Sequence, residues 1–275
     1  MTLRAALLQL RTPETHEAAL AQVEPLARQA AAAGARFILT PEGTNVLQRD
    51  RERLFATLRT QDDDPVVQGL RALARELDVW VLIGSALVRR PDGDGRATNR
   101  SLLIGADGEI RARYDKLHMF VADLPTGESP RESDSYAPGE AATVAETPWG
   151  GLGLSVCYDV RFPGLYRRMA RAGAVMFSVP SAFTRPTGEA HWEVLLRARA
   201  IENGAFVLAP AQGGEHADGR RTWGRSLVVD PWGKVIAQDH GDEPGVILAD
   251  LELEAVARAR RALPSLQHER EFAGP

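Results

Sequence analysis

Residues 151–164 read GLGLSVCYDVRFPG, an apolar and glycine-rich run that stops at Cys157. The first part has the character of a buried strand, and Cys-Tyr-Asp followed by Arg-Phe-Pro breaks it. A strand that ends in this way presents a side chain at its end, facing a cleft. Cys157 is also the only cysteine of the chain, so it forms no intramolecular disulfide. The position alone predicts either a nucleophilic thiol or a small buried apolar side chain.

Strand-like and helix-like segments alternate on both sides of this run. We expect strands at residues 3–9, 36–39, 79–88, 99–104, 141–147, 151–156, 174–179, 205–209, 225–229, 235–237 and 245–250. We expect helices at residues 14–33, 65–77, 164–172 and 188–203. No linker, repeat or low-complexity segment divides them, so the pattern predicts one domain, residues 1–275, of layered α/β or α+β architecture.

Two connections stand out between these segments. Pro-Asp-Gly-Asp-Gly at 91–95 predicts a turn that joins two strands into a hairpin. Residues 117–139 have little periodicity and are rich in proline, glycine, serine and acids. A loop of that length usually carries function or is disordered.

Composition narrows the class of protein. The 275 residues are 44% hydrophobic and 25% charged, with a formal net charge of −4. Nucleic-acid binding needs a concentrated positive field, and a membrane span needs about 18–20 apolar residues, so neither partner is expected. MTLRAALLQL (1–10) predicts a first buried strand rather than a secretion signal. One unpaired thiol fits the reducing cytoplasm.

Three further residues lie where a scaffold places working groups. Glu42 follows Phe-Ile-Leu-Thr-Pro, Lys116 begins the long loop, and Glu132 lies within it. Each alone is typical of a solvated surface charge. With Cys157 they form a hydrolytic set, because a thiol that attacks an amide needs a base, a cation for the oxyanion and an acid for the leaving nitrogen. Glu42 serves as base and then acid, Lys116 as the cation, and a backbone N–H just after Cys157 as a second oxyanion donor.

A Cys-His pair is the alternative mechanism, with His118 or His191 as the base. His118 lies in a loop beside Met119, and His191 lies beside Trp192 in a predicted helix. Neither histidine is needed for the hydrolytic set. No metal or cofactor is expected, since the lone cysteine would need other ligand types nearby.

Three segments carry a resemblance to a known family. LTPEGTN (39–45), YDKLHMF (114–120) and SVCYDVRFPGL (155–165) resemble, in order and spacing, the catalytic segments of the nitrilase superfamily of carbon–nitrogen hydrolases. The resemblance implies that Glu42 is the general base, Lys116 the oxyanion stabiliser and Cys157 the nucleophile. It implies that Glu132 orients the lysine and that Tyr158 supplies the backbone donor. The implied fold is a four-layer α-β-β-α sandwich, paired into homodimers through a helical face.

Two longer segments are similar to the Nit branch of that superfamily, namely 183–212 and 223–233. The branch implies an amidase that works through a thioester on small amides with a 2-oxo acid end. Deaminated glutathione is the implied substrate, and omega-amidase activity on 2-oxoglutaramate or 2-oxosuccinamate is the alternative. GGEHADGRR (213–221) is a variable loop. A non-catalytic nitrilase-like binding or scaffold protein remains the alternative of another class, although binding alone does not require this polar set.

A 2-oxo acid substrate carries a carboxylate, so an arginine or backbone donor is expected in the pocket. Arg161, Arg185 and Arg199 lie near the active segments, although structural ion pairs are the commoner role for such residues. The substrate-binding residues that we expect are Tyr136, Tyr158, Arg161, Phe183 and Thr184. Tyr136 could close over the ligand, and His191 and Trp192 could form walls. Asp115 departs from the family pattern before Lys116, and we expect it to point away because neighbours in an extended segment face opposite sides.

Overall fold

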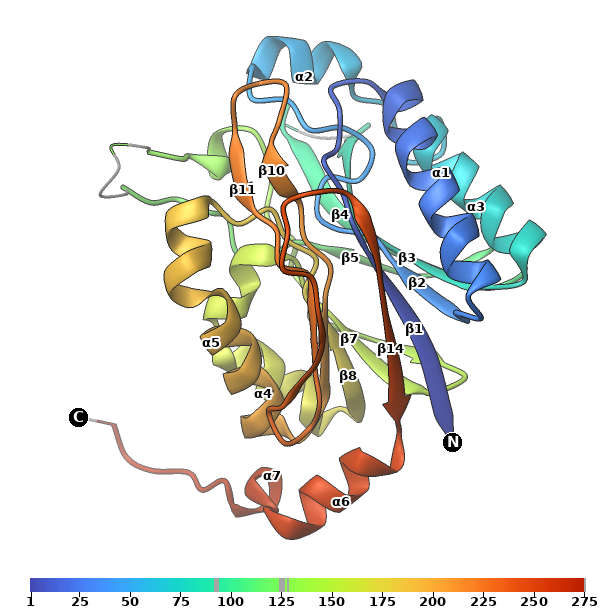
Figure 1. The fold of residues 1–275 in the computed structure, drawn as a ribbon. Helices are drawn as coiled ribbons and strands as arrows, with labels where there is room; N and C mark the ends of the chain where they lie inside the picture. Colours follow the sequence, from blue (N-terminus) through green and yellow to red (C-terminus); the bar gives the residue numbers. More distant parts are fainter. Residues whose placement is uncertain (92–93, 124–126, 128, 275) are drawn as a thin grey trace.

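Two six-stranded sheets lie face to face between two helical layers in the computed structural model (Figure 1). The structure describes residues 1–91, 94–123, 127 and 129–274. The first sheet runs in the order β14 (Gly245–Glu252), β1 (Thr2–Gln9), β2 (Phe37–Leu39), β3 (Trp80–Arg89), β4 (Ala97–Ile104), β5 (Ile110–Asp115). The second runs in the order β13 (Val235–Gln238), β12 (Leu227–Val229), β9 (Phe206–Ala209), β8 (Ala174–Ser178), β7 (Gly150–Leu154), β6 (Thr143–Thr147).

Helices cover the outer face of each sheet. α1 (His16–Ala32) and α3 (Pro65–Leu77) pack on the first sheet, and α4 (Pro163–Arg171) and α5 (Arg185–Asn203) pack on the second (Figure 1). One apolar cluster fills the space between α1, α3 and the first sheet. A second, larger cluster joins the facing sheets to α4 and α5, and a small third one lies around Leu54 of α2 (Arg51–Thr57). The predicted layered α/β class and the four-layer sandwich are therefore confirmed.

The strand directions place several chain segments at one end of the sandwich. β1, β2 and β3 are parallel, as are β7, β8 and β9. Side chains that follow parallel strands gather at the edge where the carboxyl ends meet. Close packing beneath this edge depends on Gly84 of β3, since a Cβ there would lie 1.9 Å from the carbonyl oxygen of Thr40. Glu42 follows β2 and Cys157 follows β7, so the topology brings them to the same region.

The predicted strands and helices are present with shifted ends. α5 begins at Arg185, three residues before the predicted start, with Pro186 in its first turn. β3 and β4 are antiparallel neighbours, which confirms the predicted hairpin, although residues 92–93 of its turn lie outside the described residues. Within the predicted loop 117–139, residues 124–126 and 128 are likewise not described, and Glu132–Asp134 form a short 3-10 helix, η1.

Several elements were missing from the prediction. They are β5, α2 (Arg51–Thr57), the hairpin of β10 (Gly213–Glu215) and β11 (Arg221–Trp223), the 3-10 helices η1 and η2 (Cys157–Arg161), α6 (Glu254–Ala262) and α7 (Ser265–His268). Most are short or polar. β5 reads IRARYD and alternates charged and apolar residues at the edge of its sheet, so it lacks the apolar run that marks a central strand.

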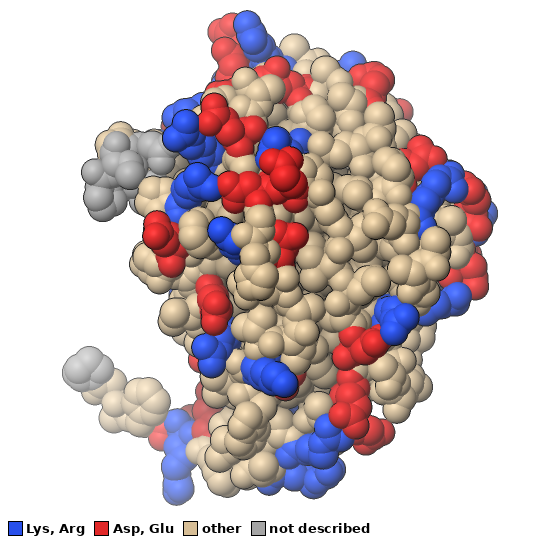
Figure 2. All heavy atoms as spheres, in the orientation of Figure 1, with Lys and Arg blue, Asp and Glu red and all other residues tan. Residues whose placement is uncertain are grey.

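Charge is mixed on the face seen in Figure 2, where acidic and basic side chains lie beside one another around a broad area that carries neither. Many of the charged side chains of the described residues form surface ion pairs, such as Arg4 with Asp250 at 2.8 Å and Arg258 with Glu252 at 2.8 Å. Within the described residues, no helix combines the length and apolar character needed to cross a bilayer.

Candidate active site

A tight turn after β7 presents Cys157. The strand ends at Leu154, and Cys157 then begins η2 with a φ of 51°, a left-handed conformation that is uncommon for residues other than glycine. The Cys157 N–H donates to the carbonyl of Pro180 at 2.9 Å. Within the described part of the chain, the next N–H, that of Tyr158, donates to no protein acceptor. Among the described residues this N–H, which follows the cysteine directly in the chain, therefore has no protein partner.

Asp159 stabilises this turn through hydrogen bonds. Its buried carboxylate accepts from the Val156 N–H at 2.8 Å, from the Tyr114 hydroxyl at 2.6 Å and from the His118 N–H at 3.1 Å. Tyr114 ends β5 and His118 follows Lys116, so one carboxylate ties the cysteine turn to the lysine segment. This residue had no assigned role in the sequence-based prediction.

Glu42 lies where the chain leaves β2 through Pro41. Its Oε1 accepts from the Asn99 side-chain amide at 2.9 Å and from the Lys116 ammonium at 3.0 Å, and its Oε2 accepts from the Ala182 N–H at 2.9 Å. Its own carbonyl accepts from the Gln212 side chain at 2.9 Å. These contacts, which come from β4, the end of β5 and the segments after β8 and β9, fix the carboxylate.

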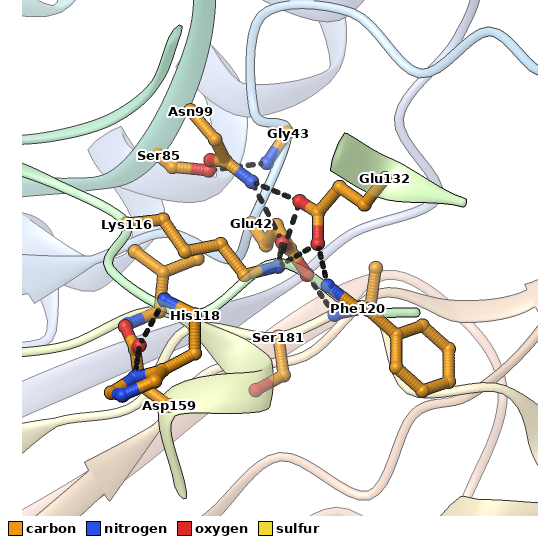
Figure 3. A network of polar contacts seen from close by, with 12 residues as sticks. Glu42, Gly43, Ser85, Asn99, Lys116, His118, Phe120, Glu132, Asp159 and Ser181 are labelled. Atoms are coloured by element: carbon orange, nitrogen blue, oxygen red, sulfur yellow. Dashed lines mark hydrogen bonds and ion pairs between the residues drawn. The ribbon is translucent and has the colours of Figure 1, made fainter. Parts of the chain in front are cut away.

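Lys116 lies between two carboxylates, as Figure 3 shows. Its ammonium donates to both oxygens of Glu132 at 2.8 Å and to Glu42 at 3.0 Å, and its side chain is only 2% exposed. Glu132 also accepts from the Phe120 N–H at 2.6 Å and from Asn99 at 3.3 Å. A buried ammonium that is paired on two sides is rigid and keeps its charge.

The environment sets the protonation of this cluster. Burial opposes the charge on Glu42, but the Lys116 charge and the hydrogen bonds from Lys116 and Asn99 prevail, so the pKa of Glu42 is lowered. Burial and the Glu42 carboxylate raise the pKa of the Cys157 thiol well above its ordinary value, against the pull of Lys116. Burial acts against the charge of Lys116 as well, yet Glu132 and Glu42 raise its pKa well above its ordinary value. The cluster therefore holds a protonated thiol, an ionised carboxylate and an ammonium close together.

A cavity of about 370 Å³ opens beside these groups. It is lined by Glu42, Gly43, Leu47, Gln48, Arg49, Arg51, Leu54, Leu87, Asn99, Lys116, Phe120, Ser129, Pro130, Arg131, Glu132, Ser135, Tyr136, Cys157, Ala182, Thr184 and Arg220. The volume is in the range of small-molecule sites. Of the expected substrate-binding residues, Tyr136 and Thr184 are in this lining.

The other expected residues lie elsewhere. Tyr158, Arg161 and Phe183 are outside the described lining of the cavity. The Arg161 guanidinium instead lies over the Tyr158 and Phe183 rings, 5.7 and 5.4 Å from their centres. The Phe183 ring packs against that of Trp192, with 5.0 Å between centres.

Arg185 and Arg199 both make structural contacts. Arg185 pairs with Asp242, and Arg199 donates to the Val160 carbonyl at 2.8 Å. Asp115 forms two bonds of 2.7 and 2.9 Å to Arg100, which hold its carboxylate in a separate ion pair from the one that Lys116 makes.

Neither candidate histidine of a Cys-His pair contacts the thiol in the described structure. His118 Nδ1 lies 2.7 Å from Asp159, and the His118 ring stacks on Phe162 with 3.5 Å between ring centres. His191 lies beside Arg161 at 3.4 Å. A histidine base therefore has no support among the described residues, and Glu42 remains the candidate for this role.

Sequence reasoning missed Asn99 and the arginines of the cavity wall. Asn99 is buried on β4 and bonds both Glu42 and Glu132. A buried amide at the start of an apolar strand was the available signal. Arg49 and Arg51 lie close together, but Arg131 and Arg220 lie far from them and from each other in polar segments, so no local pattern identified the four as one group.

The chain is similar to known proteins over most of its length. The carbon-nitrogen hydrolase family model matches residues 4–261. A deaminated glutathione amidase of Yersinia enterocolitica is 44% identical over 96% of this chain and 92% of its own length. The human deaminated glutathione amidase is 40% identical over 89% of this chain and 75% of its own length.

Solved structures are similar over nearly the whole chain. The NitFhit protein of C. elegans superposes with a TM-score of 0.90 and 34% identity, covering 98% of this chain and 65% of that protein. A mutant of the amidase from Nesterenkonia sp. AN1, solved with acrylamide added at its active-site cysteine, gives 0.78 and 28%, covering 95% of this chain and 98% of the amidase. By sequence and by fold, the protein belongs to the carbon-nitrogen hydrolase family.

Proposed function

We propose that this protein is an amidase that hydrolyses the amide bond of deaminated glutathione through a thioester on Cys157. The observation that carries the proposal is the cluster of Glu42, Lys116, Glu132 and Cys157 at one wall of a cavity of substrate size. The name shared by the relatives from Yersinia enterocolitica and human supports the choice of substrate. A binding or scaffold protein would have no need of a buried lysine between two carboxylates beside a thiol.

The first half of the reaction forms the thioester. The Cys157 sulfur attacks the amide carbon while its proton passes to Glu42, whose lowered pKa keeps it ready as a base. The tetrahedral oxyanion is stabilised by the Lys116 ammonium and the Tyr158 N–H. Glu42 then gives its proton to the departing nitrogen as the C–N bond breaks, which leaves the acyl group on the sulfur.

The second half releases the acid. Water enters after the amine has left, and Glu42 removes a proton from it as the oxygen attacks the thioester carbon. The C–S bond breaks, the sulfur takes the proton back, and the 2-oxo acid departs. Throughout both halves Glu132 keeps the Lys116 ammonium in place, through two bonds of 2.8 Å.

A comparison of two substrates tests this proposal. Deaminated glutathione and 2-oxoglutaramate share the acyl half and differ in the leaving group, a dipeptide in one and ammonia in the other. The proposal predicts a higher kcat/KM for deaminated glutathione and loss of both activities in Cys157→Ala. A higher kcat/KM for 2-oxoglutaramate would make the protein an omega-amidase, and full turnover by Cys157→Ala would refute the thioester.

We also propose that the protein works in the cytoplasm as a homodimer. Val194 and Ile201 are exposed on α5, and Trp232 is exposed on the turn before β13. That turn lies against the helix, because the Gly233 carbonyl accepts from Arg197 of α5 at 2.8 Å. An apolar surface of this kind suits a second copy. Light scattering after gel filtration should give twice the chain mass, and a monomer at micromolar concentration would contradict the pairing.

A further inference from the structure

Four arginines line the cavity in addition to the catalytic lysine: Arg49, Arg51, Arg131 and Arg220. The Arg131 guanidinium is occupied, since it donates to the Ala122 carbonyl at 2.7 Å and to the Asp123 carboxylate at 2.6 Å. The Arg51 guanidinium lies over the Phe55 ring, 4.7 Å from its centre. Arg49 is exposed in the loop before α2. These three are held by protein groups or lie mainly in solvent, which leaves Arg220.

Arg220 is placed differently. Its side chain is 33% exposed, and in the described structure its guanidinium has one ionic partner, Asp218, at 3.8 Å. That separation is beyond hydrogen-bonding distance. Arg220 lines the cavity, and no described residue takes up the donors of its guanidinium, so these donors are available to a ligand.

The hairpin that carries Arg220 is anchored beside the cavity. β11 bridges Thr184 through Thr222, and the Trp223 N–H donates to the Phe183 carbonyl at 2.9 Å. His216 Nε2 lies 2.8 Å from the Thr222 hydroxyl. Burial lowers the pKa of His216 to about 4, so this contact is uncharged at neutral pH. The arginine is thus presented from a fixed support, the arrangement that a recognition group needs.

Tyr136 adds a second donor to the same cavity. Its hydroxyl makes no hydrogen bond to the described residues. Burial and the Glu132 carboxylate raise the pKa of this hydroxyl, while the nearby Arg220 charge pulls the other way. A neutral hydroxyl and an available guanidinium in one cavity match a carboxylate, which accepts from both.

We propose that Arg220 determines the substrate class by binding the carboxylate of the 2-oxo acid end, with the Tyr136 hydroxyl as its partner donor. This inference rests on the proposed function and deepens it. The acyl half would then lie between Arg220 and the Cys157 thiol, with the leaving group toward the cavity mouth. Because deaminated glutathione and 2-oxoglutaramate share the acyl half, Arg220 would serve both equally.

Two amides of the same length isolate this carboxylate. 2-Oxoglutaramate carries it, and 4-oxopentanamide has a methyl group in its place. The ratio of their kcat/KM values measures carboxylate recognition while cancelling effects on the chemistry. Arg220→Gln should lower this ratio by about 10- to 100-fold, the usual effect of losing a hydrogen bond to a charged group, and Arg220→Lys should restore part of it.

Arg221 provides the matched control. It is the next residue of the same hairpin, it faces away, and it pairs with Glu215 at 2.9 Å with its side chain 65% exposed. Arg221→Gln should leave the ratio at the wild-type value. An equal loss on both amides in Arg220→Gln, no change in the ratio, or a loss confined to deaminated glutathione would each overturn the inference.

A binding readout separates this inference from the proposed function. 2-Oxoglutarate carries the same carboxylate and should protect Cys157, the single thiol, from alkylation by iodoacetamide in the wild type. That protection should need at least tenfold more 2-oxoglutarate in Arg220→Gln. If the wild type hydrolysed neither amide, the proposed function would fail while this measurement still decided the role of Arg220. Equal protection of the two proteins would refute it.

Discussion

Replacing Glu42 with glutamine removes the base while retaining most of its shape. The new side-chain oxygen can still accept from Lys116 and Asn99, but its amide nitrogen then faces the Ala182 N–H, so two donors meet. A buried unsatisfied donor costs about 1–3 kcal/mol of stability. Lys116 keeps both of its 2.8 Å bonds to Glu132, so the protein should still fold.

The catalytic loss should be larger than the loss of stability. General base catalysis contributes about 10²- to 10⁴-fold, or about 2.7–5.4 kcal/mol in the barrier. At the same time the variant loses the carboxylate that raises the pKa of Cys157, while the Lys116 ammonium remains, so that pKa should fall. We therefore predict that Glu42→Gln hydrolyses amides at least 100-fold more slowly and yet is alkylated faster by iodoacetamide.

Steady-state kinetics and timed alkylation at pH 7.5, read by intact mass, measure the two effects on one preparation. Glu14→Gln is a control, because Glu14 lies outside the cavity and accepts from Gln48 at 2.9 Å. Slower alkylation together with lower activity would refute the reasoning, since it would mean that Glu42 generates a resting thiolate rather than receiving the proton during attack.

Four further predictions concern the turn that Asp159 stabilises, the protonation of Glu42, the protonation of Lys116 and the cooperativity of unfolding. Asp159→Asn should lower stability by about 1–3 kcal/mol in chemical denaturation, because one acceptor of the Tyr114, Val156 and His118 donors becomes a donor itself; an unchanged midpoint would contradict this role. Glu42 has a lowered pKa, so its contribution to stability is present above pH 4.5 and is lost as the pH falls through the lower pKa of the folded state. The acid limb of the pH profile of kcat/KM should therefore have its midpoint below pH 4.5. A midpoint above pH 4.5 would contradict the lowered pKa. Lys116 has a raised pKa, so its contribution to stability is present below pH 10.5 and is lost only as the pH rises through the higher pKa of the folded state. Deprotonation of this lysine should therefore cause no loss of activity near pH 9. If residues 1–275 are one domain, calorimetry should give one transition, whereas two resolved transitions would divide the chain.

The layers of the fold could be predicted because apolar periodicity is strong in its central elements. β7 and β8 are buried almost throughout, and their apolar runs stand out in the sequence. β5 and the β10–β11 hairpin were missed because they contain many polar residues and no apolar run. They are held as strands by pairing with neighbouring segments rather than by the strand propensity of their own residues. Edge strands of this kind carry little information in their own residues.

The site residues also fall into those that the sequence could predict and those that it could not. Glu42 and Cys157 could be predicted because they follow β2 and β7, two buried strands with an apolar pattern. Lys116 follows the edge strand β5 and Glu132 lies in η1, so no pattern in a neighbouring element marked these two. The cavity wall was predicted less well. Arg161 was favoured because it lies close to Cys157 in sequence, but its guanidinium lies over the Tyr158 ring. Arg220 lines the cavity although it comes 63 residues after Cys157 in the chain. Which arginine lines the cavity therefore depends on where the β10–β11 hairpin packs, and contacts between segments distant in sequence determine that position.

Trapping the acyl enzyme tests the central claim most directly. The wild type is mixed with deaminated glutathione, quenched in acid within the first turnovers and analysed by intact mass and peptide mapping. The account predicts a 2-oxoglutaryl group on the peptide that contains Cys157, its disappearance as substrate is consumed, and its absence from Cys157→Ala. Turnover with no adduct at any quench time, together with activity retained in Cys157→Ala, would contradict the account.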